Sequence, residues 1–237
     1  MPCSGSTVRS ADQPWNAERS APVSFSTEDL VRRYVIAKRL VVEAGYETEI
    51  AWQTGVRVQD VTSTTFVREA AWVVLSAGMH ERVVRGRFSM LAAALHEFDP
   101  AAVVHDRGAR SAALLAFRHE RKIDAILSIA RVAHVRGTRG IRRSLADDAY
   151  SFLGSLPYMG PATARHLAKN LGLCVAKPDR HLVRITRAAH RADPDGLCDE
   201  IARWLGDPVA VVDVVFWRWA TLHRRCGLLT CDGLPHV

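Results

Sequence analysis

The chain has 237 residues, of which 48% are hydrophobic and 24% are charged, and this composition is ordinary for a globular protein. The length suffices for one large domain or two small ones with a buried core. No apolar run reaches the roughly 18 residues that a membrane-spanning helix needs, and residues 1–22 lack the apolar region of a secretory signal. The formal charge of +7 indicates a polyanionic partner without identifying it.

The cysteines are scattered along the chain and odd in number: Cys3, Cys174, Cys198, Cys226 and Cys231. This usage favours reduced thiols over a disulfide framework. Together with the absence of a recognisable signal segment, it predicts a cytoplasmic protein.

The chain order predicts a series of helices. Residues 1–24 are rich in Ser, Pro and Ala without periodicity, and we expect a flexible arm there. Ser26 is a good N-cap for a first helix that Gly45 ends or breaks. After a loop at 55–63, the strongly apolar helix 66–77 is expected to be buried nearly all round. Further helices are expected at 81–98, 111–117, 120–135, 145–156, 161–171, 180–190, 197–205 and 209–225, with a basic loop at 137–143.

The expected fold is all-α, with about ten helices packed in two lobes, because no two strand-like runs flank a convincing hairpin turn. Within a helical region spanning 25–237, the central lobe is expected at about 66–156. A turn and a functional segment follow at 156–185. The remaining lobe would be built from 25–65 and 186–237.

Positive charge is concentrated in two segments. Residues 121–143 contain seven Lys or Arg and one acid, Asp124, and residues 165–191 contain seven Lys or Arg and one acid, Asp179. Each segment carries +6, so the rest of the chain is net negative. Charge runs are usually solvated helix faces. Their position on both sides of one turn favours a phosphate-binding face instead.

That turn is Leu156-Pro157-Tyr158-Met159-Gly160, and Pro161 then occupies the first position of the next helix. A tight turn before a helix directs free N–H groups outward, and these can hold a phosphate oxygen without reading base sequence. The carbonyls of the turn could hold a monovalent cation beside the same phosphate.

The turn resembles the helix-hairpin-helix of the DNA glycosylase superfamily that includes endonuclease III and the adenine glycosylases. Members carry a Leu-Pro-Gly-Val-Gly-like hairpin and, further along, an essential Asp. Here Tyr158 replaces the first Gly, and Asp179 follows Gly160 by 19 residues. Asp179 lies in a segment, 177–185, that is similar to the family's Val-Asp-Thr-His-Val-x-Arg-Val. Segments 72–79 and 121–126 are also similar, so the resemblance covers about residues 66–185.

The resemblance implies a two-lobed helical glycosylase fold, double-stranded DNA as the partner and Asp179 as the catalytic residue. By position in the motif, it also implies that the following residues contact DNA: Leu156, Tyr158, Met159, Gly160, Ala162, Thr163, Arg180 and His181.

Asp179 has a chemical role that suits this function. Breaking an N-glycosidic bond leaves an oxocarbenium-like sugar, and a carboxylate can stabilise that charge and orient or deprotonate a water. The simplest structural role of Asp179 is to cap the helix 180–190, which Asp does well. Both roles can hold at once.

Bifunctional members of the family carry a Lys just after the hairpin, which forms a Schiff base with the sugar. The matching position here is Ala162, so the resemblance implies a monofunctional enzyme that uses water. Lys169 lies nearly two turns further on and is expected to point elsewhere. Lys177 is an unorthodox candidate for the amine.

No cofactor is expected to be required. The endonuclease III branch holds an iron–sulfur cluster with four cysteines near its C-terminus, whereas only Cys226 and Cys231 lie close together here. Four thiolates in a compact spacing are needed, so we expect no cluster. His223 with these two cysteines could ligate zinc. The favoured interpretation is that the three residues simply lie on the end of a helix and the tail that follows it.

A flipped base must enter a pocket, and a side chain must fill the gap that it leaves in the duplex. Trp72 lies near the family's base pocket and could stack on the base, although a buried core aromatic explains it as well. Glu69 could read a base edge. Gly78 stands where the family places its wedge residue, so Met79 or His80 would intercalate instead.

The leading hypothesis is therefore a monofunctional DNA glycosylase, acting in base-excision repair or on modified bases of foreign DNA, for which a monomer suffices. One alternative is a non-catalytic DNA-binding protein that retains the hairpin. Another is a bifunctional glycosylase with lyase activity. Neither the excised base nor the biological role follows from the sequence.

Overall fold

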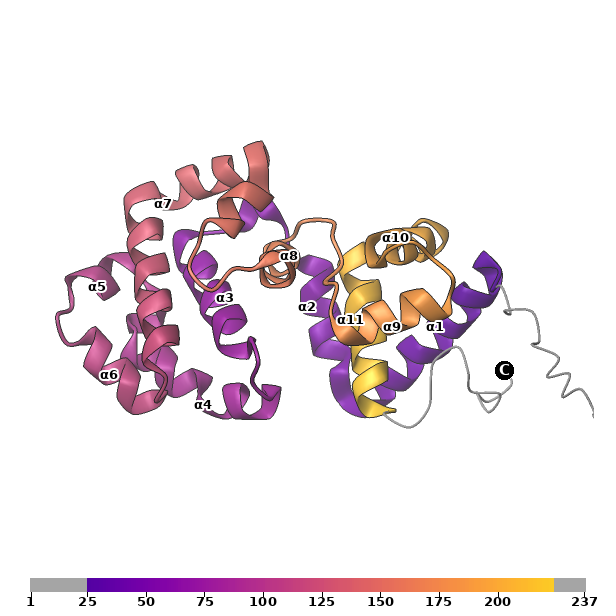
Figure 1. Cartoon of the computed structure of the whole chain (residues 1–237), viewed down its shortest axis with the longest axis horizontal. Helices are drawn as coiled ribbons and strands as arrows, with labels where there is room; N and C mark the ends of the chain where they lie inside the picture. The colour runs from indigo at the N-terminus through magenta and orange to yellow at the C-terminus, as the bar shows by residue number, and fades with distance from the viewer. Residues whose placement is uncertain (1–24, 224–237) are drawn as a thin grey trace, which may run out of the picture.

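A computed structural model describes residues 25–223 of the chain (Figure 1). Within that range the protein is built from helices without a strand, which confirms the all-α prediction for the part described. The expected arm at 1–24 and the tail with Cys226 and Cys231 lie outside the described residues. The α-helices are α1 (Thr27–Val41), α2 (Glu47–Gly55), α3 (Ser63–Ser76), α4 (Glu81–Ala94), α5 (Pro100–His105), α6 (Ala109–Ala116), α7 (Glu120–Gly154), α8 (Pro161–Asn170), α9 (Arg180–Ala188), α10 (Pro194–Leu205) and α11 (Val209–Leu222).

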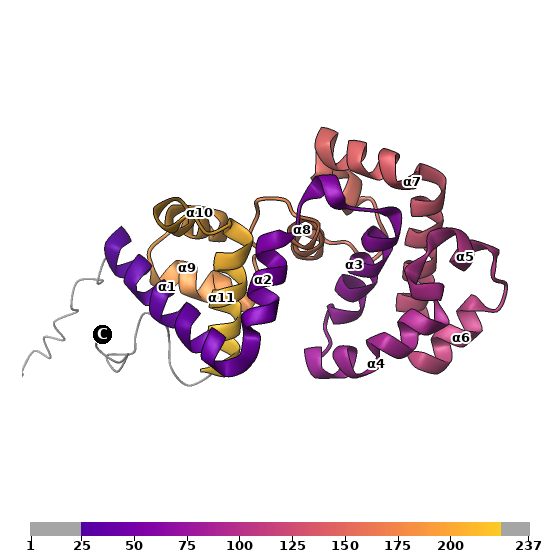
Figure 2. The same cartoon turned by 180° about the vertical axis from the view of Figure 1, so that it is seen from behind.

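The helices form two hydrophobic cores. The first, here called the central cluster, is made by residues between Val61 and Leu171, which lie mainly on α3 to α8. The second, the terminal cluster, combines α1 and α2 with α9, α10 and α11, from Leu30 to Ala220. Figures 1 and 2 show the two clusters side by side, with α2 and α8 at their junction.

Helix α3 is at the centre of the first cluster, packed against α7, α8 and α4. Its apolar side chains, such as Phe66, Val73 and Val74, are fully buried. The expectation that this helix is buried nearly all round is wrong, because Glu69 and Trp72 lie on a partly exposed face. That face lines a cleft between the clusters.

The expected basic loop at 137–143 is helical. Helix α7 runs through it with a kink at Gly137, whose φ is 61°. Ile141 and Leu145 are one turn apart and both are buried in the central cluster, so burying them favours helix over loop. Arg142 Nε also donates to the Val61 carbonyl at 2.8 Å.

Two other interruptions of the helices occur where the backbone has positive φ values. Gly45, at φ 88°, lies in a π-helical turn, 42–46, between α1 and α2, as its expected role of helix breaker requires. The helix expected at 81–98 ends at Ala94 instead. A short 3-10 turn follows at His96–Phe98, where backbone φ values are positive.

None of the helices in the described part of the chain is long and apolar enough to cross a membrane.

Gly172, two residues after the end of α8, gives a test of how closely the backbone packs at the junction. Its φ is +89°, and a Cβ there would lie 2.9 Å from the Arg57 and Val58 backbone. Gly172→Ala should lower the free energy of unfolding by about 2 kcal/mol or more, because both the strain and the clash must be relieved. Urea unfolding followed by circular dichroism measures this change.

Gly86→Ala is the control, because Gly86 is exposed within α4 and a Cβ there meets nothing within 4 Å. This variant should be more stable by about 0.5–1 kcal/mol. Equal stability changes in the two variants would contradict the close approach at Gly172.

Candidate functional site

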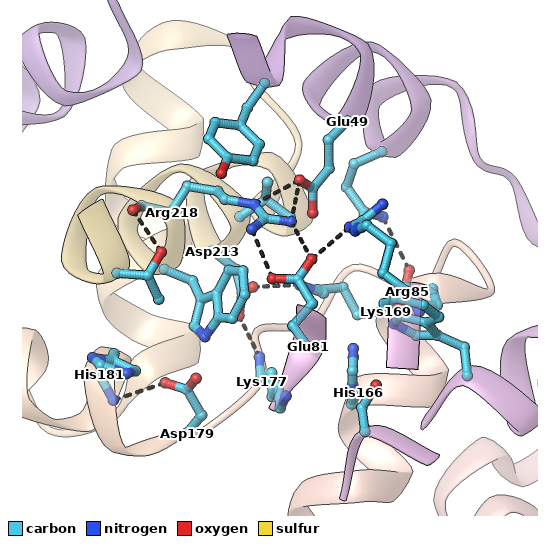
Figure 3. A pocket seen from close by; sticks show the side chains of 18 of the residues that line it. Glu49, Glu81, Arg85, His166, Lys169, Lys177, Asp179, His181, Asp213 and Arg218 are labelled. Atoms are coloured by element: carbon cyan, nitrogen blue, oxygen red, sulfur yellow. Dashed lines mark hydrogen bonds and ion pairs between the residues drawn. The ribbon is translucent and has the colours of Figure 1, made fainter. Parts of the chain in front are cut away.

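A cleft of about 1530 Å³ lies between the two clusters. Its walls come from α3, α4 and α8 on one side and from α2, α11 and the start of α9 on the other. Eight Lys or Arg and five Asp or Glu side chains line it, so its formal charge is +3. Figure 3 shows the polar side chains that meet there.

Asp179 is the N-cap of α9 and lines this cleft. Its Oδ1 accepts hydrogen bonds from the backbone N–H groups of His181 and Leu182, both at 2.9 Å. Within residues 25–223 no further hydrogen bond is made to Oδ2, which keeps its lone pairs for a ligand or a water. The predicted cap and a group available for chemistry are therefore the same carboxylate.

The segment that carries Asp179 is held by two carboxylates from outside it. The Ala176 N–H donates to Asp195 Oδ1, and the Lys177 N–H donates to Asp213 Oδ2, each at 2.6 Å. Asp213 lies on α11 and Asp195 on α10. Asp179 is thereby positioned by the terminal cluster rather than by a free loop.

Asp213 also receives Lys169 from α8. The Lys169 ammonium donates to Asp213 Oδ1, and both side chains are buried. The expectation that Lys169 points away is wrong: it lines the same cleft as Asp179. A lysine in the last turn of α8 reaches across because α11 presents an otherwise uncompensated buried carboxylate.

Lys177 lies between Asp179 and Asp213 in Figure 3. Burial lowers the pKa of its amine, and Lys169 adds to this shift, while Asp179, Asp213 and Glu81 oppose it. Burial and the two lysines likewise hold the pKa of His166 well below its usual range. His166 is therefore neutral at pH 7.

An arginine clasp lies in the wall of the cleft. Arg218 of α11 donates from Nε to Glu49 of α2 at 2.6 Å, and from Nη1 and Nη2 to both oxygens of Glu81 at 2.9 and 2.8 Å. Arg85 holds Glu81 as well, at 2.5 Å. Since Glu81 begins α4, this network joins the central cluster to the terminal cluster, as Figure 3 shows.

Sequence reasoning missed Asp213 and Arg218. The available signal was a pair of charges within an otherwise apolar helix, 209–222, where buried ions need partners. The sequence could not name those partners, because Glu49, Glu81 and Lys169 are distant along the chain.

Two predicted base-pocket residues lie on the α3 wall. Trp72 packs edge-on against Phe88 with centroids 5.2 Å apart, and the Arg85 guanidinium lies 5.4 Å from its ring centroid. Glu69 Oε2 accepts a hydrogen bond from Asn170 Nδ2 at 3.0 Å. Burial raises the pKa of Glu69 to about 7, against the lowering effects of Asn170 and Arg68.

The predicted wedge residues also line the cleft. Gly78, at φ +70°, turns the chain between α3 and α4. Met79 packs partly against the central cluster, whereas His80 is exposed at the N-terminus of α4. Arg180 and His181, at the start of α9, line the same cleft.

The predicted turn residues lie elsewhere: Leu156, Tyr158, Met159, Gly160, Ala162 and Thr163 are not among the cleft-lining residues. Leu156 and Met159 are buried in the central cluster, so only their backbone could contact a ligand. Tyr158 has φ +67°, the left-handed conformation that favours glycine, and its side chain is partly exposed.

The turn is closed by its own hydroxyl. Thr163 Oγ1 lies 2.9 Å from the Gly160 carbonyl and 3.2 Å from the Tyr158 carbonyl. A cation at these carbonyls would have to displace that hydroxyl. Among the described residues there is no group of three His, Cys, Asp or Glu that could hold a metal ion. The zinc alternative involving Cys226 and Cys231 falls outside them.

No protein-family model, curated protein or solved structure matches this chain.

The Lys169–Asp213 pair should be required for folding. Asp213→Asn leaves a buried ammonium without its ionic partner, and we expect a loss of about 3 kcal/mol or more in the free energy of unfolding. Urea denaturation measures it. Glu28→Gln is the control, because it removes an exposed partner 3.5 Å from Arg32 and should change stability by less than about 0.5 kcal/mol. Similar losses in both variants would refute a special role for Asp213.

Proposed function

We propose that this protein is a monofunctional DNA glycosylase, which hydrolyses the N-glycosidic bond of a flipped, modified base and leaves an abasic site. The observation that carries the proposal is Asp179. It is a carboxylate with one oxygen held by backbone N–H groups and the other uncommitted within the described chain, in a positively charged cleft. A protein that only binds DNA has no need of a carboxylate there.

Hydrolysis of the N-glycosidic bond would use the uncommitted Oδ2 of Asp179. The bond between the sugar C1′ and the base nitrogen breaks, and its electron pair leaves with the base. Asp179 stabilises the cationic sugar, and a water oxygen then bonds to C1′ while its proton passes to the carboxylate or to solvent. The base must leave the helix for this attack, and the cleft supplies the space for it.

Duplex DNA would be held at the start of α8. Pro161 has no N–H, and the first helical hydrogen bond of α8 runs from the Ala164 N–H to the Gly160 carbonyl. The N–H groups of Ala162 and Thr163 therefore precede the helical hydrogen-bond pattern, and such groups bind phosphate at a helix N-terminus. Leu156 and Met159 anchor the turn, because their side chains are buried in the central cluster. Gly160 and Ala162 are exposed at this turn, and Arg180 is exposed at the start of α9; all three would contact the backbone of the duplex.

One observation favours lyase activity as the second candidate. Ala162 offers no amine, but the Lys177 amine lies in the cleft with a lowered pKa, which makes an amine more nucleophilic at neutral pH. The Lys177 amine would condense with the C1′ aldehyde of the ring-opened abasic sugar, with loss of the aldehyde oxygen as water, to give a Schiff base that borohydride reduces to a covalent adduct.

The first experiment uses duplexes that each carry one modified base, and reads strand breaks with and without alkali. We expect alkali-dependent cleavage of at least one duplex. Asp179→Asn should lower the rate at least 100-fold, because Asn cannot carry the stabilising charge. The variant should still bind that duplex.

Asp193→Asn is the matched control. Asp193 caps α10 through a 2.8 Å bond to the Gly196 N–H and lies outside the cleft. Asn is an adequate N-cap, so both variants keep their helices. Cleavage without alkali, together with a borohydride adduct that Lys177→Gln abolishes, would establish the lyase instead. Binding without any cleavage would favour the non-catalytic alternative.

The phosphate site is tested separately. Ala162→Glu places a negative charge at the start of α8, and should weaken duplex binding about tenfold at 100 mM salt through repulsion of a phosphate. Fluorescence anisotropy measures the affinity. Ala101→Glu is the control, since α5 also begins with Pro-Ala and Ala101 is exposed. Equal losses in both variants would indicate non-specific repulsion and not a site at α8.

A further inference from the structure

The last turn of α8 collects polar groups that the proposed hydrolysis does not use. Glu69 from α3 bonds the Asn170 side chain, and Gln53 from α2 donates from Nε2 to the Lys169 carbonyl at 3.2 Å. These two side chains come from different clusters and converge on consecutive residues. All four residues line the cleft.

Gln53 has a buried hydrogen-bond acceptor that no group of the described structure satisfies. The residue is 2% exposed, and its Oε1 is buried without a hydrogen-bond partner in the described structure. A buried amide oxygen without a donor costs free energy, so such groups usually meet water or a ligand. Because Gln53 lines the cleft, its Oε1 is an acceptor without a donor that a ligand N–H group could satisfy.

Glu69 supplies the complementary donor. Its Oε2 already accepts from Asn170, so the proton of the neutral acid belongs on Oε1. Burial raises its pKa to about 7, so a large part of the population is neutral at physiological pH. Bringing phosphates close to the cleft would raise that pKa further.

The surroundings of Glu69 do not cancel this effect. Arg68, on the same helix, lowers the pKa and is itself 3.9 Å from Glu97. Lys169 is paired with Asp213, and His166 is neutral. Among the other charged groups on elements packed around α3, Arg85 of α4 is engaged with Glu81, and Lys122 of α7 with the Leu75 and Ala77 carbonyls. Arg82 of α4 also lines the cleft, but it is not among the groups that shift the pKa of Glu69.

We infer that Glu69 and Gln53 form a hydrogen-bonding subsite for the edge of a neutral nucleobase that carries a carbonyl beside a ring N–H. Glu69 donates to the carbonyl oxygen, and Gln53 Oε1 accepts from the N–H. This lactam edge is found in deaminated and oxidised bases. The inference rests on the proposed function, because it names the class of base which that site would excise.

The charge of the cleft selects among bases with similar edges. With Glu69 neutral, the eight basic groups face four acids, for a net +4. This field favours an electron-rich carbonyl oxygen over an amino group, and it repels a cationic, N-alkylated base. Alkylated purines are therefore excluded as the preferred substrates.

Binding is best measured without turnover, in the Asp179→Asn background. The probes are duplexes that contain uracil, hypoxanthine, 8-oxoguanine, 7-methylguanine or a base-free tetrahydrofuran. We expect at least one lactam duplex to bind tenfold or more tightly than the base-free duplex at pH 6. That preference should decline as pH rises above 7, by up to tenfold per pH unit, because ionised Glu69 cannot donate.

Two substitutions at Glu69 separate its role from folding. Glu69→Gln keeps a donor and cannot ionise, so it should retain the preference and lose its pH dependence. Glu69→Leu should remove the preference while thermal unfolding shows a folded protein. A preference that survives in Glu69→Leu, or tightest binding to 7-methylguanine, would overturn the subsite.

The failure of the subsite and the failure of the proposed function differ in outcome. Excision by the otherwise unchanged protein, with base selectivity unaltered by either Glu69 substitution, would refute the subsite and leave the glycosylase standing. A Glu69-dependent lactam preference without excision of any base would support the subsite and refute the glycosylase.

Discussion

The arrangement of the whole molecule depends on one buried carboxylate. Asp213 lies in an apolar helix and is 2% exposed, so its charge must be compensated locally. Lys169 from α8 satisfies one oxygen, and the Lys177 N–H, two residues before Asp179, satisfies the other. These bonds tie the central cluster to the terminal cluster and hold the segment that presents Asp179. The position of the cleft therefore follows from the requirement that this charge be neutralised.

The clasp at Arg218, five residues further along α11, satisfies a second buried charge in the same way. Burial disfavours the charge of Arg218, but its bonds to Glu81 and Glu49 outweigh this and raise its pKa. Because Glu81 begins α4 and Glu49 lies on α2, the clasp joins elements of both clusters. Lysines and arginines exceed acids among the residues that line the cleft, so the cleft attracts anions.

The proposed site combines groups that were visible in the sequence with groups that were not. Asp179 was identifiable because an N-cap acid in a basic segment is a local pattern, and α9 does begin directly after it. Position in the family resemblance predicts Trp72, Met79 and His80, and Glu69 precedes Trp72 by three residues. All four line the same cleft. Gln53 and Asn170 carry no local signal. Asp213 and Arg218 stand out as charges in an apolar helix, but their partners are far away in the chain.

Periodicity and capping thus determined the all-α class of the described chain, most helix positions and the tight turn before α8, because these depend on residues within one or two turns of each other. The same local rules failed at 137–143, where burial of Ile141 and Leu145 overrides a basic, glycine-containing stretch. Only the tertiary structure decided that Lys169 turns into the cleft and that Glu69 holds a proton near pH 7. Desolvation and charge pairing cause both effects, and both depend on which distant segments exclude water from the same place.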